Sequence, residues 1–226
     1  MTNQIWIAID GPAGSGKSSI AKKLIDYLPN FIHINTGAFY RIIAYYFFLN
    51  KIDYKNDNLR ISNLNEIQLN FDLNNEVIIK SLNDLNPKEF IYNETIAKIA
   101  SEIAIYPDVR NKINNILKTI SLNKNIIMDG RDIGTVVLPN ANLKIFIDAD
   151  SRTRALRRLK DENLDISELE KVQKIIEQRD YNDYNRKIGA LKIADDAIVI
   201  KNDNLTIDDC CKLITSYLNQ SKKSNL

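Results

Sequence analysis

The chain has 226 residues, of which 44% are hydrophobic and 27% charged, with a formal net charge of +2. This length suits one α/β domain with a small insertion, and the near balance of charges gives no global signal for nucleic acid or a membrane surface. The amino terminus lacks a basic region, and no stretch approaches the ~20 apolar residues that cross a bilayer, so we expect a cytoplasmic protein without a membrane partner.

The two cysteines and the single histidine limit the chemistry further. Cys210 and Cys211 are adjacent in a predicted helix, where a bridge between them is geometrically unfavourable. We therefore expect free, partly buried thiols. His33 is the only histidine and lies in a predicted strand, so we assign it a structural role and expect no histidine-based metal site or triad.

The first predicted elements surround a glycine-rich loop. The apolar run Ile5–Ile9 predicts a short buried strand, and apolar Ile20, Leu24 and Leu28 indicate a helix after it. Between them, Gly11–Ser18 fits the phosphate-binding pattern G-x-x-x-x-G-K-[ST] in the required order of strand, loop and helix. The alternative is a glycine-rich turn that carries a lysine by chance.

Each residue type in this loop has a physical role toward phosphate. Glycines allow positive φ and close backbone approach, so that successive N–H groups and the helix N-terminus can surround an anion. Lys17 can reach the β- and γ-phosphates, and the Ser18 hydroxyl can bind Mg²⁺. We expect the loop to bind a nucleoside triphosphate through Gly11, Pro12, Ala13, Gly14, Ser15, Gly16, Lys17, Ser18 and Ser19.

A second strand is predicted over residues 31–35, followed by a helix that continues to about Leu49. In an open parallel sheet the carboxyl ends of strands face the ligand crevice. Thr36 and Arg41 therefore lie where a second substrate can bind, although Arg41 alone also suits a solvated helix surface. Residues 50–53 match the guanine-reading pattern N-K-x-D, which we interpret as chance because it comes too early in the chain.

Residues 54–93 change character. Asn-rich loops surround three runs that we interpret as a small inserted antiparallel sheet, with strands over residues 67–73, 76–81 and 90–93. The Asn74-Asn75 pair can supply a tight turn. A helical pattern resumes at Glu94.

Candidate polar residues follow in the second half. Pro107 predicts the start of a helix, and Ser101 and Arg110 flank that junction, although each also suits a simple surface position. A third strand over residues 126–128 ends in Asp129-Gly130-Arg131-Asp132. Charges bunched at a strand's carboxyl end are unusual for mere surface, although Arg131 can simply pair with either acid.

The remaining elements complete the sheet. A fourth strand covers residues 143–147, and Ser151 is expected to cap a helix that carries four arginines, which suit either a solvated face or a polyphosphate. Residues 167–170 match a capping box for the next helix. A fifth strand covers residues 197–200, and the terminal helix begins near Thr206.

Six segments in this order resemble bacterial cytidylate kinases over nearly the whole chain: IAIDGPAGSGKSS, NTGAFYR, IASEIAIYPDVR, MDGRDIGTVVLPNA, KIFIDADSRTRALRR and QRDYNDYNR. Adenylate, thymidylate and shikimate kinases share only the first. The resemblance implies a P-loop NTPase three-layer α/β core with a parallel five-stranded sheet. It also implies one domain over residues 1–226, with an NMP-binding insertion at 60–95 and a mobile LID at 150–165.

The resemblance implies transfer of the γ-phosphoryl group of ATP to CMP or dCMP, with Mg²⁺ held in part by Ser18, in a monomer that binds no nucleic acid. Arg41, Arg131, Arg179 and Arg186 correspond to the clamp on the CMP phosphate. The cytosine readers are Ser101, Arg110 and Asp132, the ribose contact is Asp183, and the pocket lining is Thr36 and Tyr40. Arg157 and Arg158 correspond to LID residues near the transferring phosphate, which act in catalysis with Lys17, Arg131 and Arg179.

Two positions depart from the family pattern. Asn35 stands where an aspartate is common, and Ala190 where a proline is common. Two rival functions remain at this point: a kinase for UMP or a small metabolite, and a nucleotide-dependent switch. The cytosine-reading residues argue against the first rival, and the lack of ordered guanine-reading and switch motifs argues against the second.

Overall fold

The computed structural model describes residues 4–71, 77–79 and 90–223. The chain divides into two compact units. Unit 1 combines Met1–Ile34 with Asn123–Leu226, and unit 2 is Asn35–Leu122. Each unit is described on its own.

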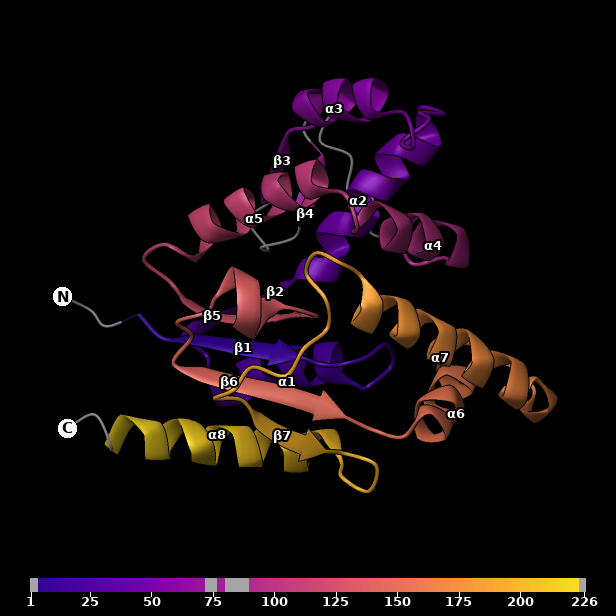
Figure 1. Cartoon of the computed structure of the whole chain (residues 1–226). Coiled ribbons are helices and arrows are strands. Elements are labelled where there is room, and N and C mark those ends of the chain that lie inside the picture. The colour runs from indigo at the N-terminus through magenta and orange to yellow at the C-terminus, as the bar shows by residue number, and fades with distance from the viewer. Residues whose placement is uncertain (1–3, 72–76, 80–89, 224–226) are drawn as a thin grey trace. The chain divides into compact units, whose positions relative to one another are not determined.

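Unit 1 is built around a five-stranded sheet with the order β2-β5-β1-β6-β7 (Figure 1). β1 pairs in parallel with β5 and β6, and β6 pairs in parallel with β7. The strands are β1 (Trp6–Asp10), β2 (Phe31–Asn35), β5 (Asn125–Gly130), β6 (Leu143–Asp148) and β7 (Ile198–Lys201). The predicted α/β core around a parallel five-stranded sheet is confirmed.

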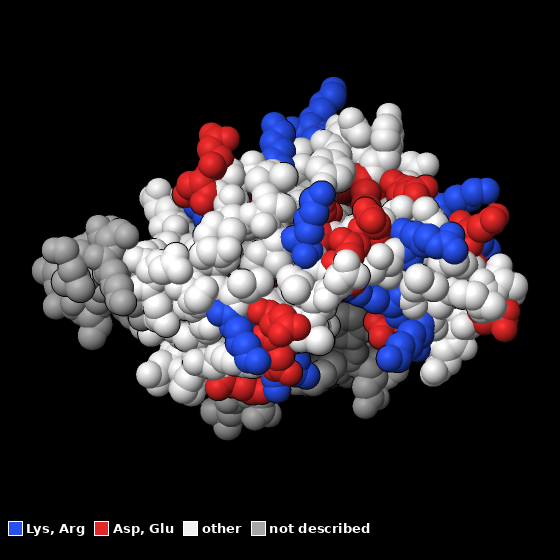
Figure 2. All heavy atoms as spheres, turned by 90° about the horizontal axis from the view of Figure 1, so that it is seen from below, with Lys and Arg blue, Asp and Glu red and all other residues white. Residues whose placement is uncertain are grey.

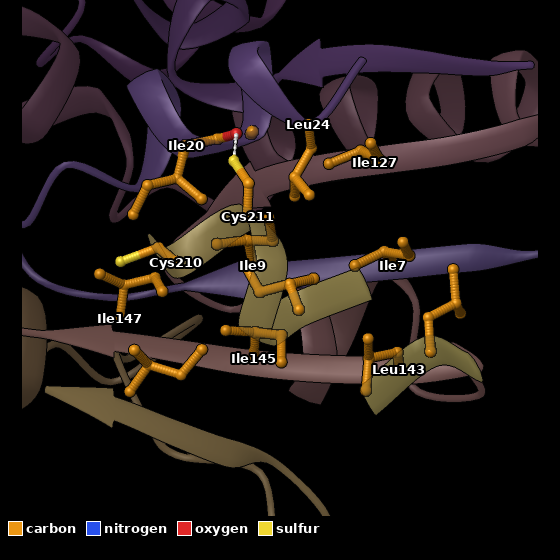
Figure 3. Close-up of a cluster of buried hydrophobic side chains, with 14 of the residues drawn as sticks. Ile7, Ile9, Ile20, Leu24, Ile127, Leu143, Ile145, Ile147, Cys210 and Cys211 are labelled. Atoms are coloured by element: carbon orange, nitrogen blue, oxygen red, sulfur yellow. Dashed lines mark hydrogen bonds between the residues drawn. The ribbon is translucent and has the colours of Figure 1, made fainter. Parts of the chain in front are cut away.

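Two helices cover one face of this sheet, α1 (Lys17–Tyr27) and α8 (Ile207–Lys223). Ile7 and Ile9 of β1 point to this face and pack with side chains from both helices (Figure 3). Cys210 and Cys211 are free and completely buried there, more deeply than the sequence indicated. Burial raises the pKa of the Cys211 thiol to about 11, which makes it a packing residue rather than a nucleophile.

The opposite face of β1 carries Ala8 and Asp10, and η3 (Ile133–Val137) contacts β1 and β5. After β6 come α6 (Ser151–Asp161), η4 (Ile166–Glu168) and α7 (Leu169–Asn185), and α6 packs on α7 through a small apolar cluster.

Two predicted helix caps in this region are wrong. Ser151 is already the first residue of α6, because Asp150 occupies the N-cap, and the Ser151 hydroxyl bonds Glu177 instead. The capping box over residues 167–170 does not form, because Asp165 caps the short η4 turn that leads into α7.

Unit 2 is mainly helical. Its elements are α2 (Thr36–Leu49), α3 (Asp57–Glu66), β3 (Leu69–Phe71), β4 (Val77–Ile79), α4 (Glu94–Ile103) and α5 (Pro107–Ser121). The sequence analysis missed α3, because only Arg60 and Leu64 of this polar helix are buried and it shows no clear apolar stripe. The start of α3 does carry a common N-cap residue, since the Asn56 side chain accepts a hydrogen bond from the Leu59 N–H at 3.2 Å.

Two strands form where an antiparallel sheet was predicted, and β3 and β4 pair antiparallel. The predicted strand over residues 90–93 is wrong: these residues form a turn and bends. Phe90 stacks on Tyr45 at 5.7 Å between ring centroids, and Asn93 caps α4 by accepting from the Ile96 N–H. The Asn74-Asn75 turn lies outside the described residues.

Across the described residues, no helix combines the length and apolarity needed to cross a membrane. On the face that Figure 2 shows, Lys and Arg side chains lie interspersed with Asp and Glu.

Candidate active site

The glycine-rich loop joins β1 to α1, and its backbone requires glycine. Gly14 and Gly16 have φ values of 72° and 85°, in the left-handed region. A Cβ atom on Gly11 would lie 2.2 Å from the Ile147 carbonyl oxygen, so any larger residue would force the loop and β6 apart. Gly16 is the N-cap of α1 and brings no side chain to the first helical N–H groups. The loop therefore has the backbone form of an anion site.

Lys17 is the cation of this loop and is 7% exposed. Its Nζ donates to the Pro12 carbonyl oxygen at 3.0 Å. Burial lowers the pKa of Lys17 well below its ordinary value, and the nearby charges of Arg131 and Arg179 lower it further. Such a group favours an anionic ligand, whose charge would stabilise the ammonium.

Asp129 lies at the carboxyl end of β5, beside β1, and is 1% exposed. Its Oδ2 accepts from the Ser18 hydroxyl at 2.5 Å, and its Oδ1 lies 2.6 Å from His33 Nε2. The hydroxyl and carboxylate oxygens are ligands that suit Mg²⁺, which usually keeps waters and substrate phosphates for its other positions. Among the described residues, no group of three or more His, Cys, Asp or Glu is arranged to hold a metal ion.

Side chains from other elements hold the backbone of the loop. Asp180 of α7 accepts from the Ala13 N–H at 3.2 Å. Arg154 of α6 donates to the Ala13 carbonyl oxygen at 2.9 Å and pairs with Asp180 at 2.5 Å. Asn202, just after β7, donates to the Ser15 carbonyl oxygen at 2.8 Å. The loop is thus fixed by α6, α7 and the end of β7 at once.

The four arginines of α6 have different surroundings. Arg152 is exposed, whereas Arg154 is buried against the loop. Arg157 donates to the Asn202 side-chain and backbone oxygens at 3.1 and 2.7 Å. Arg158 pairs with Glu162 at 2.8 Å. A uniform solvated face is therefore excluded for this helix.

Arg131, after β5, forms its ion pair with Asp183 of α7 at 2.7 Å, rather than with Asp129 or Asp132. Arg186 pairs with the other oxygen of Asp183 at 3.3 Å and also donates to Gly189. Burial would raise the pKa of Asp183, but the charges of Arg131 and Arg186 outweigh it and hold that pKa below its usual value. Asp183 therefore holds two of the proposed phosphate-clamp arginines in place.

Asp10, the last residue of β1, supports the segment that carries Arg131 and Asp132. Its two carboxylate oxygens accept from the backbone N–H groups of Ile133 and Gly134, both at 2.8 Å. Burial raises the pKa of Asp10 to about 6, although the two backbone hydrogen bonds oppose that shift. Asp132 precedes η3 as its N-cap residue and is 5% exposed.

In unit 2, Arg41 of α2 is half-buried and donates to the Ile91 carbonyl oxygen at 3.0 Å. Its guanidinium lies 5.3 Å from the centroid of the Tyr92 ring. The alternative that Arg41 is a fully solvated helix charge is therefore excluded. At the start of the same helix Thr36 is buried, and Asn35 caps the helix by accepting from the Ala38 N–H at 3.1 Å.

Arg110 of α5 is 3% exposed, which excludes a simple surface role. It donates to the Ala104 carbonyl oxygen at 3.2 Å and lies 5.8 Å from the centroid of the Tyr40 ring. Ser101 is half-buried on α4. Thr36, Tyr40, Arg41, Ser101 and Arg110 thus all belong to unit 2, whereas Arg131, Asp132, Arg179, Asp183 and Arg186 belong to unit 1.

The profile of the cytidylate kinase family matches residues 7–220 of this chain. The chain belongs to the cytidylate kinase family. The cytidylate kinase of Mycoplasmoides gallisepticum is 42% identical to it, and the alignment covers 97% of each protein. The cytidylate kinase of Fusobacterium nucleatum is 41% identical over 97% of this chain and all of that protein. That of Mycoplasmopsis pulmonis is 40% identical over 98% of both.

Solved structures show the same fold at much lower identity. A shikimate kinase from Bacteroides thetaiotaomicron aligns with a TM-score of 0.50 and 11% identity, covering 95% of this chain and 98% of that one. An uncharacterised protein from Eubacterium ventriosum aligns with a TM-score of 0.53 and 16% identity, covering 96% and 99%. The family membership therefore rests on sequence, and these structures support the fold alone.

Sequence reasoning did not find several residues that support the loop in this family member. Asp10 was not singled out, although it ends a strand, and His33 was given only a structural role. Asp180 and Asn202 have no local signal, because each reaches the loop only through the fold, across 167 and 187 positions of sequence.

Proposed function

We propose that this chain transfers the γ-phosphoryl group of ATP to CMP and dCMP, giving ADP with CDP or dCDP. The observation that carries the proposal is the phosphate loop of unit 1, with Lys17 in the loop and the Ser18–Asp129 pair beside it, in a member of the cytidylate kinase family. The loop accounts for the nucleotide donor, and family membership indicates the acceptor.

ATP would bind with its phosphates against the backbone N–H groups of residues 11–19 and the ammonium of Lys17. The oxygen pair of Ser18 and Asp129 fits Mg²⁺, which when bound would offset charge on the β- and γ-phosphates. In the reaction a phosphate oxygen of CMP forms a new bond to the γ-phosphorus as the bond to the β–γ bridging oxygen breaks. This chemistry needs in-line positioning and positive charge more than a base, and Lys17, Arg131 and Arg179 would supply that charge.

For the acceptor, we propose that Arg41, Arg131, Arg179 and Arg186 bind the CMP phosphate, because guanidinium groups bind phosphate in a fixed bidentate geometry. Ser101, Arg110 and Asp132 would contact the cytosine edge, and Asp183 the ribose. The acceptor character of a carboxylate at Asp132 suits the exocyclic amine of cytosine and disfavours the carbonyl of uracil. Thr36 and Tyr40 would line the same pocket.

The LID at residues 150–165, the insertion at residues 60–95, the monomeric state and the cytoplasmic location stay predictions. For Arg157 and Arg158 to act on the transferring phosphate, they would exchange Asn202 and Glu162 for phosphate oxygens. We propose that α6 moves on substrate binding to allow this exchange, and that the movement also excludes water as a competing acceptor.

The test is a turnover assay with ATP, Mg²⁺ and a panel of CMP, dCMP, UMP, AMP, GMP and shikimate. We expect kcat/KM for CMP to exceed that for UMP by at least tenfold, since a site built around the cytosine amine leaves groups unpaired with uracil. A preference for UMP would favour the rival pyrimidine kinase. Absence of any phosphorylated product, in protein shown to bind ATP, would reject a kinase.

A further inference from the structure

His33 is the only histidine of the chain and lies within β2, partly buried. Its Nε2 atom is 2.6 Å from Oδ1 of Asp129. Its neighbours in the strand, Ile32 and Ile34, are apolar. An apolar side chain at position 33 would therefore also suit a strand. The contact joins β2 to the end of β5, inside unit 1.

The direction of this hydrogen bond follows from the chemistry of its partner. An ionised carboxylate only accepts, so Nε2 of His33 must carry the proton and donate to Oδ1 of Asp129. The other oxygen, Oδ2, accepts from the Ser18 hydroxyl at 2.5 Å. Two donors from two elements therefore act on the Asp129 carboxylate, one on each oxygen.

We propose that His33 is a positioning residue for the reaction: it holds Oδ1 of Asp129 so that Oδ2 stays directed at Ser18 and at the Mg²⁺ that accompanies ATP. This inference rests on the proposed function, because it assumes a metal at the Ser18–Asp129 pair. Hydrogen bonds to a metal-binding carboxylate fix its orientation, and their loss commonly lowers metal affinity or activity by about 10- to 100-fold.

A purely structural role for His33 makes different predictions. If the ring only fills space between strands, an aromatic ring without a donor should replace it without effect on metal dependence. If it positions Asp129, the donor matters and the ring does not. His33→Phe keeps the ring and removes the donor, whereas His33→Gln removes the ring and keeps an N–H donor of similar reach. Ile32→Val on the same strand is the matched control for small changes in packing.

The first measurement uses the uniqueness of the residue. In protein labelled with ¹⁵N-histidine, without nucleotide or metal, a single imidazole pair of nitrogen resonances reports which nitrogen carries the proton. We expect Nε2 to be protonated. A neutral ring protonated only at Nδ1 would overturn the proposal, whatever the variants do.

The second measurement is ATP binding by calorimetry, over a series of Mg²⁺ concentrations and with a chelator. We expect His33→Phe to require about tenfold more Mg²⁺ for half of the Mg²⁺-dependent gain in affinity, while its ATP affinity in the chelator stays within about twofold of wild type. His33→Gln should recover most of the effect, and Ile32→Val should match wild type. An unchanged Mg²⁺ requirement in His33→Phe would overturn the inference.

The same data separate this inference from the function it rests on. If wild-type protein binds ATP with no Mg²⁺-dependent gain, the proposed metal site itself fails. If wild type shows the gain and His33→Phe shows it equally, only the role of His33 fails. Should His33→Phe not fold, His33→Gln and the imidazole resonances still decide: a Gln variant that needs at least tenfold more Mg²⁺ would also count against a role for the donor.

Discussion

The phosphate loop and the segment after β5 both follow the carboxyl end of a parallel strand, yet they are held in different ways. The loop, residues 11–16, takes hydrogen bonds to its backbone from Asp180, Arg154 and Asn202, which come from three different elements. The segment from Arg131 to Gly134 is held at its backbone by the Asp10 carboxylate, through two N–H groups.

The backbone of the loop is held by side chains from several elements, whereas the Ile133 and Gly134 N–H groups both donate to one titratable carboxylate. The loop combines required glycines with two separate supports, the Arg154–Asp180 pair and Asn202, so loss of one leaves the other in place. The segment after β5 depends on a carboxylate whose pKa is raised to about 6, close to physiological pH. We therefore expect the loop to keep its conformation when one support is removed. We expect the contribution of the neighbouring segment to stability to change with pH.

The largest expected effect tests the loop's redundancy through Asp180→Ala. This change leaves the buried Arg154 without its carboxylate, which should lower the free energy of unfolding by about 3–5 kcal/mol. ATP affinity should fall less than about tenfold, because Asn202 and the glycines still constrain the loop. Urea unfolding and calorimetry measure the two quantities.

The control for this prediction is the double variant Arg154→Leu, Asp180→Leu. Replacing both charges by apolar side chains is often neutral for stability, so it should recover most of the loss. If the single variant loses less than about 1 kcal/mol, or loses ATP binding outright while staying folded, the picture of a redundantly held loop is wrong.

A second substitution, Lys17→Ala, leaves the supports of the loop in place and removes its cation. Lys17→Ala should lower kcat by about 10² to 10³, because one preorganised charge at the transferring phosphate contributes that much to transition-state stabilisation. The fold should survive, since the amine donates a hydrogen bond only to the Pro12 carbonyl oxygen among the described residues. Steady-state kinetics with CMP and a thermal unfolding curve check both halves, and a folded variant with near wild-type kcat contradicts the role.

The pH sensitivity of the segment after β5 is tested by comparing wild type with Asp10→Asn over a range of pH. The folded-state pKa of Asp10 is raised to about 6 from an ordinary 3.8, so the folded protein binds more protons than the unfolded chain between these values. Stability contributed by Asp10 is then fully present below about pH 4 and declines as pH rises through 6. The difference in unfolding free energy between wild type and Asp10→Asn should thus shrink by up to about 3 kcal/mol from pH 4 to pH 7.

Urea unfolding of both proteins at several pH values measures this difference. Asp209→Asn is the matched control, because hydrogen bonds from Thr206 lower the pKa of its carboxyl, so its difference from wild type should grow, if anything, from pH 4 to pH 7. A difference for Asp10→Asn that stays constant over this range would show that Asp10 does not titrate as its burial requires.

The same comparison explains what could be predicted from the sequence. The position and glycine backbone of the loop were predicted, because its pattern is contiguous in sequence and its conformation demands glycine at fixed spacing. Its supports were not, because Asp180 and Asn202 reach it only after α7 and β7 are placed. The strands of unit 1 were predicted from apolar runs, whereas α3 was missed because a polar helix with two buried residues has no periodic signal.

Individual candidate residues show the same limit. Arg131 was expected either to bind phosphate or to pair with a neighbouring acid, and its partner is Asp183, on α7. His33 was given a structural role because a single histidine has no motif around it. Its contact with Asp129 depends on two strands, β2 and β5, that are adjacent only in the folded sheet.

The smallest expected effect is proton uptake by Lys17 when ATP binds, and it contrasts this buried amine with the buried carboxylate of Asp10. The Asp10 carboxylate already has two backbone donors, from Ile133 and Gly134. Lys17, in contrast, is buried close to Arg131 and Arg179, and its pKa lies well below the ordinary value. A bound polyphosphate would add negative charge beside the amine and return that pKa upward. At pH 8.5 ATP binding should then take up a fraction of a proton, and ATP affinity should fall as pH rises toward 9.5. Calorimetry in two buffers of different ionisation enthalpy measures the uptake. ATP itself is fully ionised in this range, so the signal belongs to the protein, and Lys17→Met should abolish it. Equal proton uptake in wild type and Lys17→Met would show that another group titrates. It would then contradict the expectation that bound ATP raises the pKa of Lys17.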